Sequence, residues 1–227
     1  MLKTFLIIIN LQIFLFASNQ IILVVSETFN SNKAILRCFE GNKQIFHDIE
    51  VNLGKNGLGW GISDFSIKHD KNEPQKQEGD KKAPAGIFKL SHIFGYKTKE
   101  SILMPYIHIA KELICVDDAK HKNYNQIIMM PTIEPKSFEY MKRNDAQYEL
   151  GIIVEHNTKQ KQNAGSCIFI HVQKHQNTPT AGCTSMSYED LKKIVAWLDS
   201  NKNPILIQVP KKYLQEVKKL YPELALD

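Results

Sequence analysis

The sequence predicts a mostly β, α+β fold: one domain of ordinary size, preceded by a short apolar N-terminal segment. Three observations lead to this prediction. The chain has 227 residues, 43% of them hydrophobic and 9% aromatic, which is enough to fill one core. From residue 33 onward, short apolar runs of strand length alternate with turn residues. Clear helical periodicity occurs only in the last part of the chain, after Ser187.

The N-terminal segment has the composition of a secretory signal. Lys3 precedes an apolar stretch over residues 5–16, and Ala17 and Ser18 follow it. Together with the second apolar patch at residues 21–25, the stretch is also about long enough to cross a bilayer, which takes roughly 20 residues. A buried strand is disfavoured because the apolar run begins at residue 5. We therefore expect residues 1–25 to be a cleaved signal peptide or, less favoured, an N-terminal membrane anchor. Either kind of segment would place the rest of the chain in the periplasm or cell envelope.

The body of the chain, residues 26–210, reads as a series of strands and loops. Residues 68–82 are polar and charged and predict an exposed loop, whereas the mixed pattern of residues 138–150 predicts a helix. Strand-length apolar runs occur at residues 34–36, 44–46, 86–90 and 127–130.

The last third has the clearest elements. Residues 166–172 predict a strand whose alternation places Cys167, Phe169 and His171 on one face. A loop over residues 173–180 leads to a turn containing Cys183. Next come a helix capped by Ser187 with Asp190 three residues on, a strand at 205–209, and a short closing helix in the C-terminal segment 211–227. The core-facing stripe of the capped helix is formed by Leu191, Ile194, Val195 and Leu198.

The charge balance gives little information about partners. The formal charge of +5 comes almost entirely from lysine, and only Arg37 and Arg143 are arginines. Nucleic-acid readers usually carry arginine clusters interleaved with aromatic residues, so we expect no nucleic-acid partner. The sequence indicates no protein partner.

The four cysteines, at positions 38, 115, 167 and 183, are too few in so long a chain for a disulfide framework. If Cys183 is a free thiol, at least one other cysteine is also unpaired. Cys38 with Cys115 is one possible pair, and Cys167 is expected to be a core residue of its strand.

Cys183 and His171 form the strongest chemical pattern. Cys183 lies in a glycine-containing turn between polar residues, where packing gives little reason for a thiol, and His171 precedes it on the strand. A neighbouring imidazolium can lower a thiol pKa by about two units, which needs about 3 kcal/mol. A close ion pair supplies roughly 4 kcal/mol at an effective dielectric constant of 20. We therefore expect Cys183 to be a nucleophile activated by His171, with Gly182 shaping an oxyanion-binding turn.

Three other interpretations are weaker. Cys167, His171, His175 and Cys183 have zinc-like chemistry, but four residues of extended strand span about 13 Å, so Cys167 and His171 could not share an ion. His175 is a minor alternative to His171 as the base. The glycine-rich stretch at residues 54–61 lacks the ending and the helix of a phosphate-binding loop, and is expected to be a tight turn with Trp60 packed beneath it. We expect no metal and no cofactor.

Residues 165–172 together with the Pro-Thr-Ala-Gly-Cys motif at 179–183 resemble the catalytic signature of the L,D-transpeptidase catalytic-domain (YkuD-like) family. The similarity covers about residues 40–210. Further segments agree in order: residues 57–61, 79–88, 105–106, 116–118, 123–125 and 155–157. The sequence departs from the commoner family pattern because Ala181 stands in place of a histidine and Ser185 in place of an arginine or asparagine. The chain is therefore similar to a divergent branch of this family.

The resemblance implies a single β-sandwich domain that acts on peptidoglycan stem peptides. Cys183 would form a thioester with a stem peptide, His171 would be the base, and the backbone carbonyl of Val172 would orient the imidazole. An amine from a neighbouring stem then completes an L,D-transpeptidase reaction. Release by water would make the chain an L,D-carboxypeptidase. A wall-binding protein without catalysis is the third possibility.

Overall fold

The computed structural model describes residues 20–98 and 102–224. Strands occupy 37% and helices 11%, so the single mostly β domain is as predicted. The helices are α1 (Tyr188–Trp197) and α2 (Leu214–Leu220), with 3-10 turns η1 (Ser200–Lys202) and η2 (Lys211–Tyr213). The strands are β1 (Gln20–Ser26), β2 (Lys33–Glu40), β3 (Lys43–Gln44), β4 (Ile49–Asn52), β5 (Leu58–Trp60), β6 (Ala83–Gly95), β7 (Tyr106–His108), β8 (Leu113–Val116), β9 (Ile127–Met129), β10 (Phe138–Tyr140), β11 (Leu150–Val154), β12 (Phe169–Val172), β13 (Thr184–Met186) and β14 (Ile205–Pro210).

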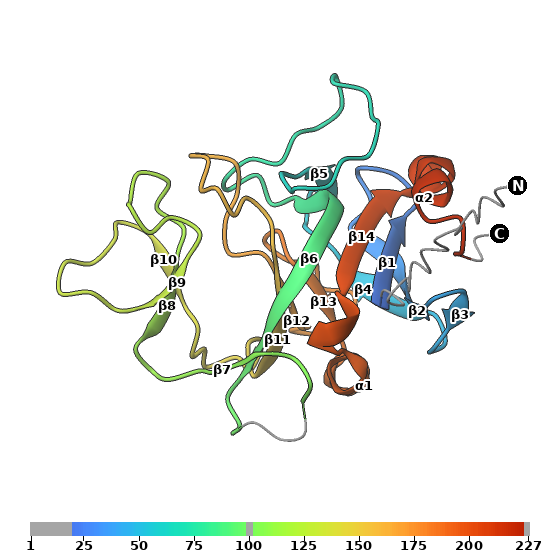
Figure 1. Cartoon of the computed structure of the whole chain (residues 1–227). Coiled ribbons are helices and arrows are strands. Elements are labelled where there is room, and N and C mark those ends of the chain that lie inside the picture. Colours follow the sequence, from blue (N-terminus) through green and yellow to red (C-terminus); the bar gives the residue numbers. More distant parts are fainter. Residues whose placement is uncertain (1–19, 99–101, 225–227) are drawn as a thin grey trace, which may run out of the picture.

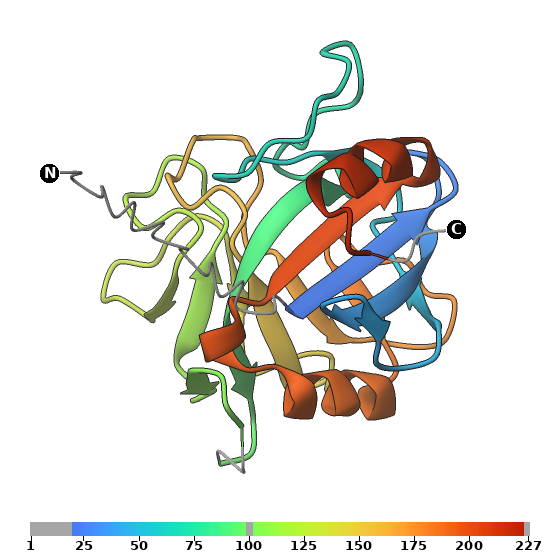
Figure 2. The same cartoon turned by 45° about the vertical axis from the view of Figure 1, so that its right-hand side comes forward.

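Eight strands pair in a closed ring within the described part of the chain. Their order is β1-β14-β6-β11-β12-β13-β4-β2, and β2 also pairs with β1. The ladder is therefore continuous, in place of the two separate sheets of a sandwich. The two helices lie at opposite ends of this barrel, whereas a small sheet of β10, β8 and β9 lies to one side of it (Figures 1 and 2).

Two groups of buried side chains follow from the alternation of the strands. The inward residues of β12, such as Ile170 and Val172, join the main core inside the barrel. The outward residue Phe169 joins a second cluster, which fills the space between the barrel and the small sheet. The buried members of this second cluster are Phe94, Ile109, Cys115, Met141, Tyr148, Cys167, Phe169 and Cys183.

The C-terminal elements agree with the sequence prediction. The Ser187 hydroxyl accepts a hydrogen bond from the amide of Asp190 and caps α1. The predicted stripe of α1 is buried, and β14 and α2 lie in the predicted positions. The predicted helix at residues 138–150 is wrong: β10 and the start of β11 occupy its ends, with turns between. The predicted strand at 166–172 begins only at Phe169, because Cys167 has a positive φ of 55°.

The boundary expected after residue 25 is also wrong. The patch at residues 21–25 belongs to β1, which pairs in parallel with β14 and antiparallel with β2. Ile21 to Val24 are at most 1% exposed, so β1 is a central strand of the domain. Residues 1–19 lie outside the described residues, and a signal peptide or anchor stays a prediction for them. Within the described ranges, no helix has the length and apolar character needed to cross a membrane.

Candidate active site

The register of β12 against β13 brings Cys183 and His171 to one face of the barrel. The two strands are parallel, with Ile170 opposite Thr184 and His171 opposite Ser185. Cys183, one residue before β13, therefore lies beside Phe169, and the Phe169 amide donates a hydrogen bond to the Cys183 sulfur (3.3 Å). Because facing residues of paired strands point to the same side, Cys183, Ser185 and His171 all point outward from the barrel.

The imidazole of His171 is held by the backbone. Its Nδ1 lies 2.8 Å from the Val172 carbonyl oxygen, which is the contact that the sequence resemblance implied. A carbonyl can only accept, so Nδ1 carries the proton in the neutral ring and Nε2 is left as an acceptor. The Tyr148 ring packs edge-on against the imidazole, with centroids 5.3 Å apart. The ring thus presents an unprotonated nitrogen in a fixed orientation.

The turn before β13 sets the position of the thiol. Thr180 accepts a hydrogen bond from the Gly182 amide (3.1 Å) and donates one to the Cys183 carbonyl (2.6 Å). Gly182 has a φ of 151°, and a Cβ at this position would lie 3.1 Å from the Lys82 carbonyl oxygen. Glycine is therefore required for the turn. The Cys183 thiol donates to the Cys167 carbonyl at 3.5 Å.

The charge state of the pair differs from the expected thiolate–imidazolium pair. Burial raises the pKa of Cys183 to about 12, and burial lowers the pKa of His171 to about 4. Both groups are therefore neutral near pH 7. No hydrogen bond joins the thiol to the imidazole in the described part of the chain, and the smaller opposing effects, such as the Phe169 amide on Cys183 and the Val172 carbonyl on His171, do not outweigh the loss of solvation.

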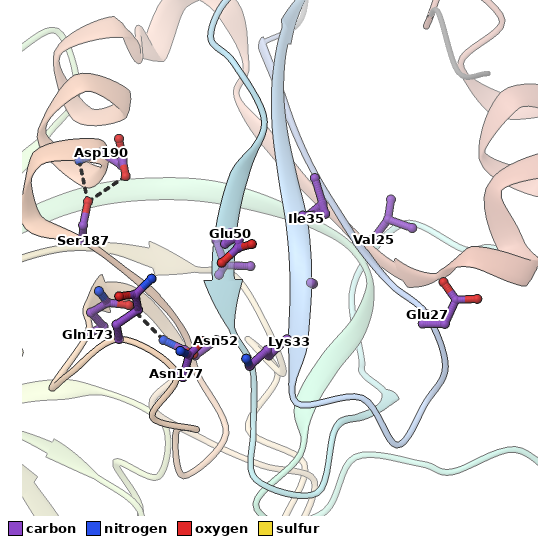
Figure 3. Close-up of a pocket in the computed structure, with 13 residues that line it drawn as sticks. Val25, Glu27, Lys33, Ile35, Glu50, Asn52, Gln173, Asn177, Ser187 and Asp190 are labelled. Atoms are coloured by element: carbon purple, nitrogen blue, oxygen red, sulfur yellow. Dashed lines mark hydrogen bonds between the residues drawn. The ribbon is translucent and has the colours of Figure 1, made fainter.

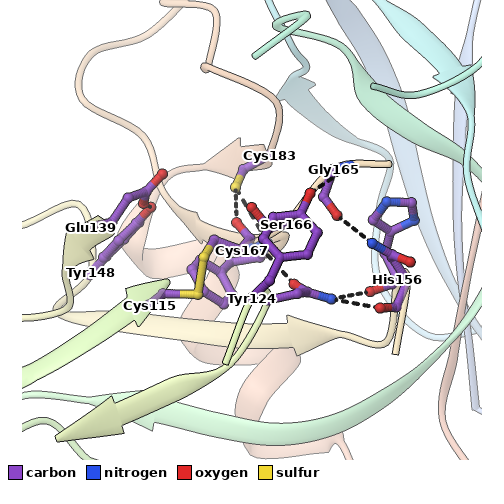
Figure 4. Close-up of a disulfide and its surroundings, with 12 residues drawn as sticks. Cys115, Tyr124, Glu139, Tyr148, His156, Gly165, Ser166, Cys167 and Cys183 are labelled. Carbon is purple, nitrogen blue, oxygen red and sulfur yellow. Dashed lines mark hydrogen bonds between the residues drawn. A yellow bond between two sulfur atoms is a disulfide. The ribbon is translucent and has the colours of Figure 1, made fainter. Parts of the chain in front are cut away.

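A disulfide between Cys115 and Cys167 ties the small sheet to the loop before β12 (Figure 4). The sequence did not predict this pair, and the suggested pair of Cys38 and Cys115 is wrong: Cys38 is a free, buried thiol. Because the Cys167 carbonyl contacts the catalytic candidate Cys183, the disulfide also fixes one neighbour of that sulfur.

Polar side chains hold the same loop from the other side (Figure 4). Asn125 accepts from the Cys167 amide and donates to the carbonyls of His156 and Asn157. Tyr124 and Ser166 both donate to the Glu78 carboxylate. Except for Glu78, these residues lie in segments that carry the family resemblance, so the resemblance located them without indicating what they do.

A second set of polar residues, missed by the sequence analysis, surrounds the pair. The Tyr148 hydroxyl donates to the Glu139 carboxylate (2.5 Å), whose pKa burial raises. The Arg143 guanidinium lies 5.0 Å from the centre of the Tyr148 ring and pairs with Asp145. All four residues fall within the stretch predicted as a helix, and no local pattern in the sequence relates them to Cys183.

Lys76 is a further buried charge near the thiol. The expected exposed loop at residues 68–82 holds it with only 4% of its side chain exposed, paired with Asp80 at 2.6 Å. Its Nζ lies 3.7 Å from the place a Gly182 Cβ would occupy, and its positive charge lowers the pKa of Cys183 against the larger effect of burial. In the sequence, the spacing of four residues between Lys76 and Asp80 was the signal that could have indicated this ion pair.

The other residues and segments named in the sequence analysis, including the segment 155–157 that contains His156, have structural positions. His156 is buried, its Nδ1 accepts from the Ile62 amide and its Nε2 donates to the Ala164 carbonyl, so it holds the loop before β12. His175 lies exposed in the loop after β12. Cys167 is engaged in the disulfide, so its sulfur is not a free ligand. Trp60 is 4% exposed, as the packed turn predicted.

The family model for the L,D-transpeptidase catalytic domain (YkuD) matches residues 20–207. Comparison with curated proteins and with solved structures gave no match. The match begins at β1 and ends within β14, so it spans the whole closed ring of strands. It supports, in general terms, a cysteine acyltransferase or peptidase that acts on peptidoglycan. The chain belongs to the L,D-transpeptidase catalytic domain (YkuD) family.

Proposed function

We propose that this protein is an L,D-transpeptidase that joins peptidoglycan stem peptides through Cys183 and His171. The observation that carries the proposal is the register of β12 and β13, which puts the thiol and the imidazole on one face, two residues apart along the strand. The Val172 carbonyl leaves Nε2 of that imidazole free to accept a proton.

The neutral pair acts by general-base catalysis. Rotation of the Cys183 side chain away from the Cys167 carbonyl turns the thiol toward Nε2. The sulfur attacks the stem carbonyl while its proton moves to His171, and the Cys183 amide donates to the oxyanion. The amine of the leaving D-residue takes that proton as the C–N bond breaks, which leaves a thioester. An amine from a second stem then attacks the thioester and gives its proton to His171. His171 passes this proton to the Cys183 sulfur as the C–S bond breaks, which restores the thiol and leaves the new amide bond.

We also propose that the protein works outside the cytoplasm, in the periplasm or cell envelope. The Cys115–Cys167 disulfide supports this location, because such bonds persist in oxidising compartments. The apolar N-terminal segment of the sequence supports it independently.

The test is incubation of the purified protein with tetrapeptide muropeptides. Cross-linked dimers are the expected product, and Cys183→Ala and His171→Ala are each expected to remove them, with the fold checked by circular dichroism. Tripeptides alone would identify an L,D-carboxypeptidase with the same pair. Full turnover in either variant would refute the assigned roles.

A further inference from the structure

Lys76 differs from every other charged residue that the structure describes. Over residues 20–98 and 102–224 it is the only lysine, arginine, aspartate or glutamate that is buried, with 4% of its side chain exposed. Removing an ammonium group from water is costly, so a lysine is rarely buried unless its charge is compensated. The Lys76 amide donates to the Trp60 carbonyl (2.9 Å), which fixes the backbone beside β5. A lysine held in this way has a charge at a defined place in the fold.

Three glycines make room for the Lys76 side chain. A Cβ at Gly59 would lie 3.0 Å from the Lys76 backbone nitrogen, and a Cβ at Gly165 would lie 2.9 Å from its Cε. Non-bonded carbon atoms pack at about 3.5–4.0 Å, so larger residues at these two positions would crowd the lysine. At the far end, the place of a Gly182 Cβ lies 3.7 Å from Nζ. The side chain therefore runs past the loop before β12 and ends at the turn that carries the nucleophile.

The ammonium group has two partners in its own loop. Nζ donates to the Gln77 carbonyl (2.7 Å) and to the Asp80 carboxylate (2.6 Å). The same carboxylate accepts from the amides of Gln77 (2.8 Å) and Lys82 (2.9 Å), so it also holds the loop in shape. An ammonium group has a third N–H, for which the described residues offer no acceptor. The charge is thus fixed beside Gly182 without being fully used by the loop.

The segment around the nucleophile has no charge of its own. Residues 179–187 contain no charged side chain. Three charged groups from other segments act on the Cys183 sulfur: Lys76 and Arg143 lower its pKa, Glu139 raises it, and burial outweighs all three. Of these groups, Lys76 is the one whose charged atom lies beside the Gly182 turn. It keeps this effect on Cys183 although it is paired with Asp80.

The proposed reaction develops negative charge at this turn. The attacking sulfur becomes more negative as its proton moves to His171, and the charge then passes to the carbonyl oxygen that accepts from the Cys183 amide. The resting thiol and the substrate carbonyl are both neutral, so a cation behind the turn interacts more strongly with the transition state than with the bound substrate. Such an interaction raises the rate of the chemical step without tightening binding of the peptide.

We propose that Lys76 is a positioning residue of the active site, whose ammonium group, held behind the Gly182 turn by Gln77 and Asp80, stabilises the negative charge that develops at Cys183 and at the attacked carbonyl. The effect on the carbonyl rests on the proposed acyl-transfer reaction. The effect on the sulfur can be measured without turnover.

Two variants separate the charge of Lys76 from its packing. Lys76→Met and Asp80→Asn both break the buried ion pair and should both lower stability in urea unfolding. They change the charge near Cys183 in opposite directions, because one removes a cation and the other removes an anion. The matched control is Lys33→Met, an exposed lysine in the polar groove of Figure 3, whose lining includes neither Cys183 nor His171.

The first measurement is the rate at which iodoacetamide labels Cys183 at pH 8, followed by mass spectrometry of the peptide that contains it. Lys76→Met should label about tenfold more slowly than the wild type, because a nearby charge in a medium of effective dielectric constant about 20 shifts the thiolate fraction by about that factor. Asp80→Asn should label at least as fast as the wild type, and Lys33→Met should match it.

Two results of the labelling would overturn the proposal. Equal slowing in Lys76→Met and Asp80→Asn would show that the ion pair acts only by holding the loop. An unchanged or faster rate in Lys76→Met would show that its charge does not reach the sulfur. If Lys76→Met does not fold, Asp80→Asn still decides, because slower labelling in that variant contradicts the proposed sign.

The second measurement is thioester formation with a tetrapeptide stem in a single turnover, followed by intact mass. Lys76→Met should lower the maximal rate about tenfold and leave the half-saturating peptide concentration within about twofold, as expected for an interaction made in the transition state. A normal rate in this variant would refute the role of Lys76 and leave the proposed function standing. No thioester in the wild type, with labelling rates as expected, would refute the proposed function and leave the effect of Lys76 on the sulfur.

Discussion

The charge state of Cys183 gives the most direct test of the site. Burial raises the pKa of this thiol to about 12 from an ordinary value of 9.0. The difference of about three pH units corresponds to about 4 kcal/mol and to a thousandfold smaller thiolate fraction at neutral pH. Since the thiolate is the form that reacts with alkylating agents, iodoacetamide should label Cys183 about a thousand times more slowly at pH 7 than it labels the unfolded chain.

The pH dependence separates electrostatics from simple shielding. Limited access lowers the labelling rate equally at every pH, whereas a raised pKa makes the rate climb tenfold per pH unit from pH 7 toward pH 11. Labelling is followed by peptide mass spectrometry, with Cys183→Ser as the control because the buried Cys38 thiol also has a pKa raised to about 12. A rate that is high and constant between pH 5 and pH 8 would refute the neutral pair and restore a thiolate–imidazolium pair.

Three further predictions concern stability. Burial lowers the pKa values of His171 and His156 to about 4 from 6.5, so their contribution is present above pH 6.5 and is lost as the pH falls through 4. For each of these histidines, the free energy of unfolding should fall by about 2 kcal/mol from pH 7 to pH 5, as measured by urea unfolding. An equal free energy of unfolding at pH 7 and at pH 5 would contradict this prediction. Ser185→Ala should raise the free energy of unfolding by about 1 kcal/mol, because it removes a buried hydroxyl without a partner; a loss of stability would show that the hydroxyl is satisfied. Replacing Cys115 and Cys167 by serine opens a loop with a sequence separation of 52 and should cost about 4 kcal/mol in thermal or urea unfolding, whereas Cys38→Ser leaves that loop closed.

The sequence predicted those elements whose pattern is local. The α1 helix has its cap, its stripe and its end within a dozen residues, and β14 is a single short run in which β-branched residues alternate with others. β1 was missed because a strand buried on both faces has a continuous apolar sequence, which does not differ from that of a membrane anchor. The alternation of residues 167–171 nevertheless assigned Cys167, Phe169 and His171 to one face correctly, although the strand begins later.

The parts of the site that escaped prediction depend on contacts between distant segments. Cys115 and Cys167 meet only because β8 packs beside the loop before β12, so spacing could not identify the pair. Glu139 and Tyr148 reach each other across the turns between β10 and β11. The pKa values of Cys183 and His171 follow from the burial of both groups, which one sequence does not reveal.

The neutral pair is compatible with fast catalysis. The two pKa values differ by about 8, so moving the proton from Cys183 to His171 in the resting site costs about 11 kcal/mol before the new charges attract each other. Their attraction at an effective dielectric constant of 20 returns roughly 4 kcal/mol. The remaining cost of about 7 kcal/mol is well below the roughly 16 kcal/mol barrier of an enzyme that turns over about ten times per second. Proton transfer can therefore accompany attack on the carbonyl, and no thiolate needs to accumulate.

A thiolate that did accumulate would be a hazard at this position. Cys183 belongs to the same buried cluster as the Cys115–Cys167 disulfide, and thiolates attack disulfide sulfurs. Exchange would join Cys183 to one of these cysteines and remove the nucleophile. Because burial keeps the sulfur protonated, the site can hold the proposed nucleophile and a disulfide side by side, even in the oxidising compartment proposed above. The raised pKa of Cys183 would thus protect the proposed nucleophile from exchange, at an energetic cost below the barrier of the proposed reaction.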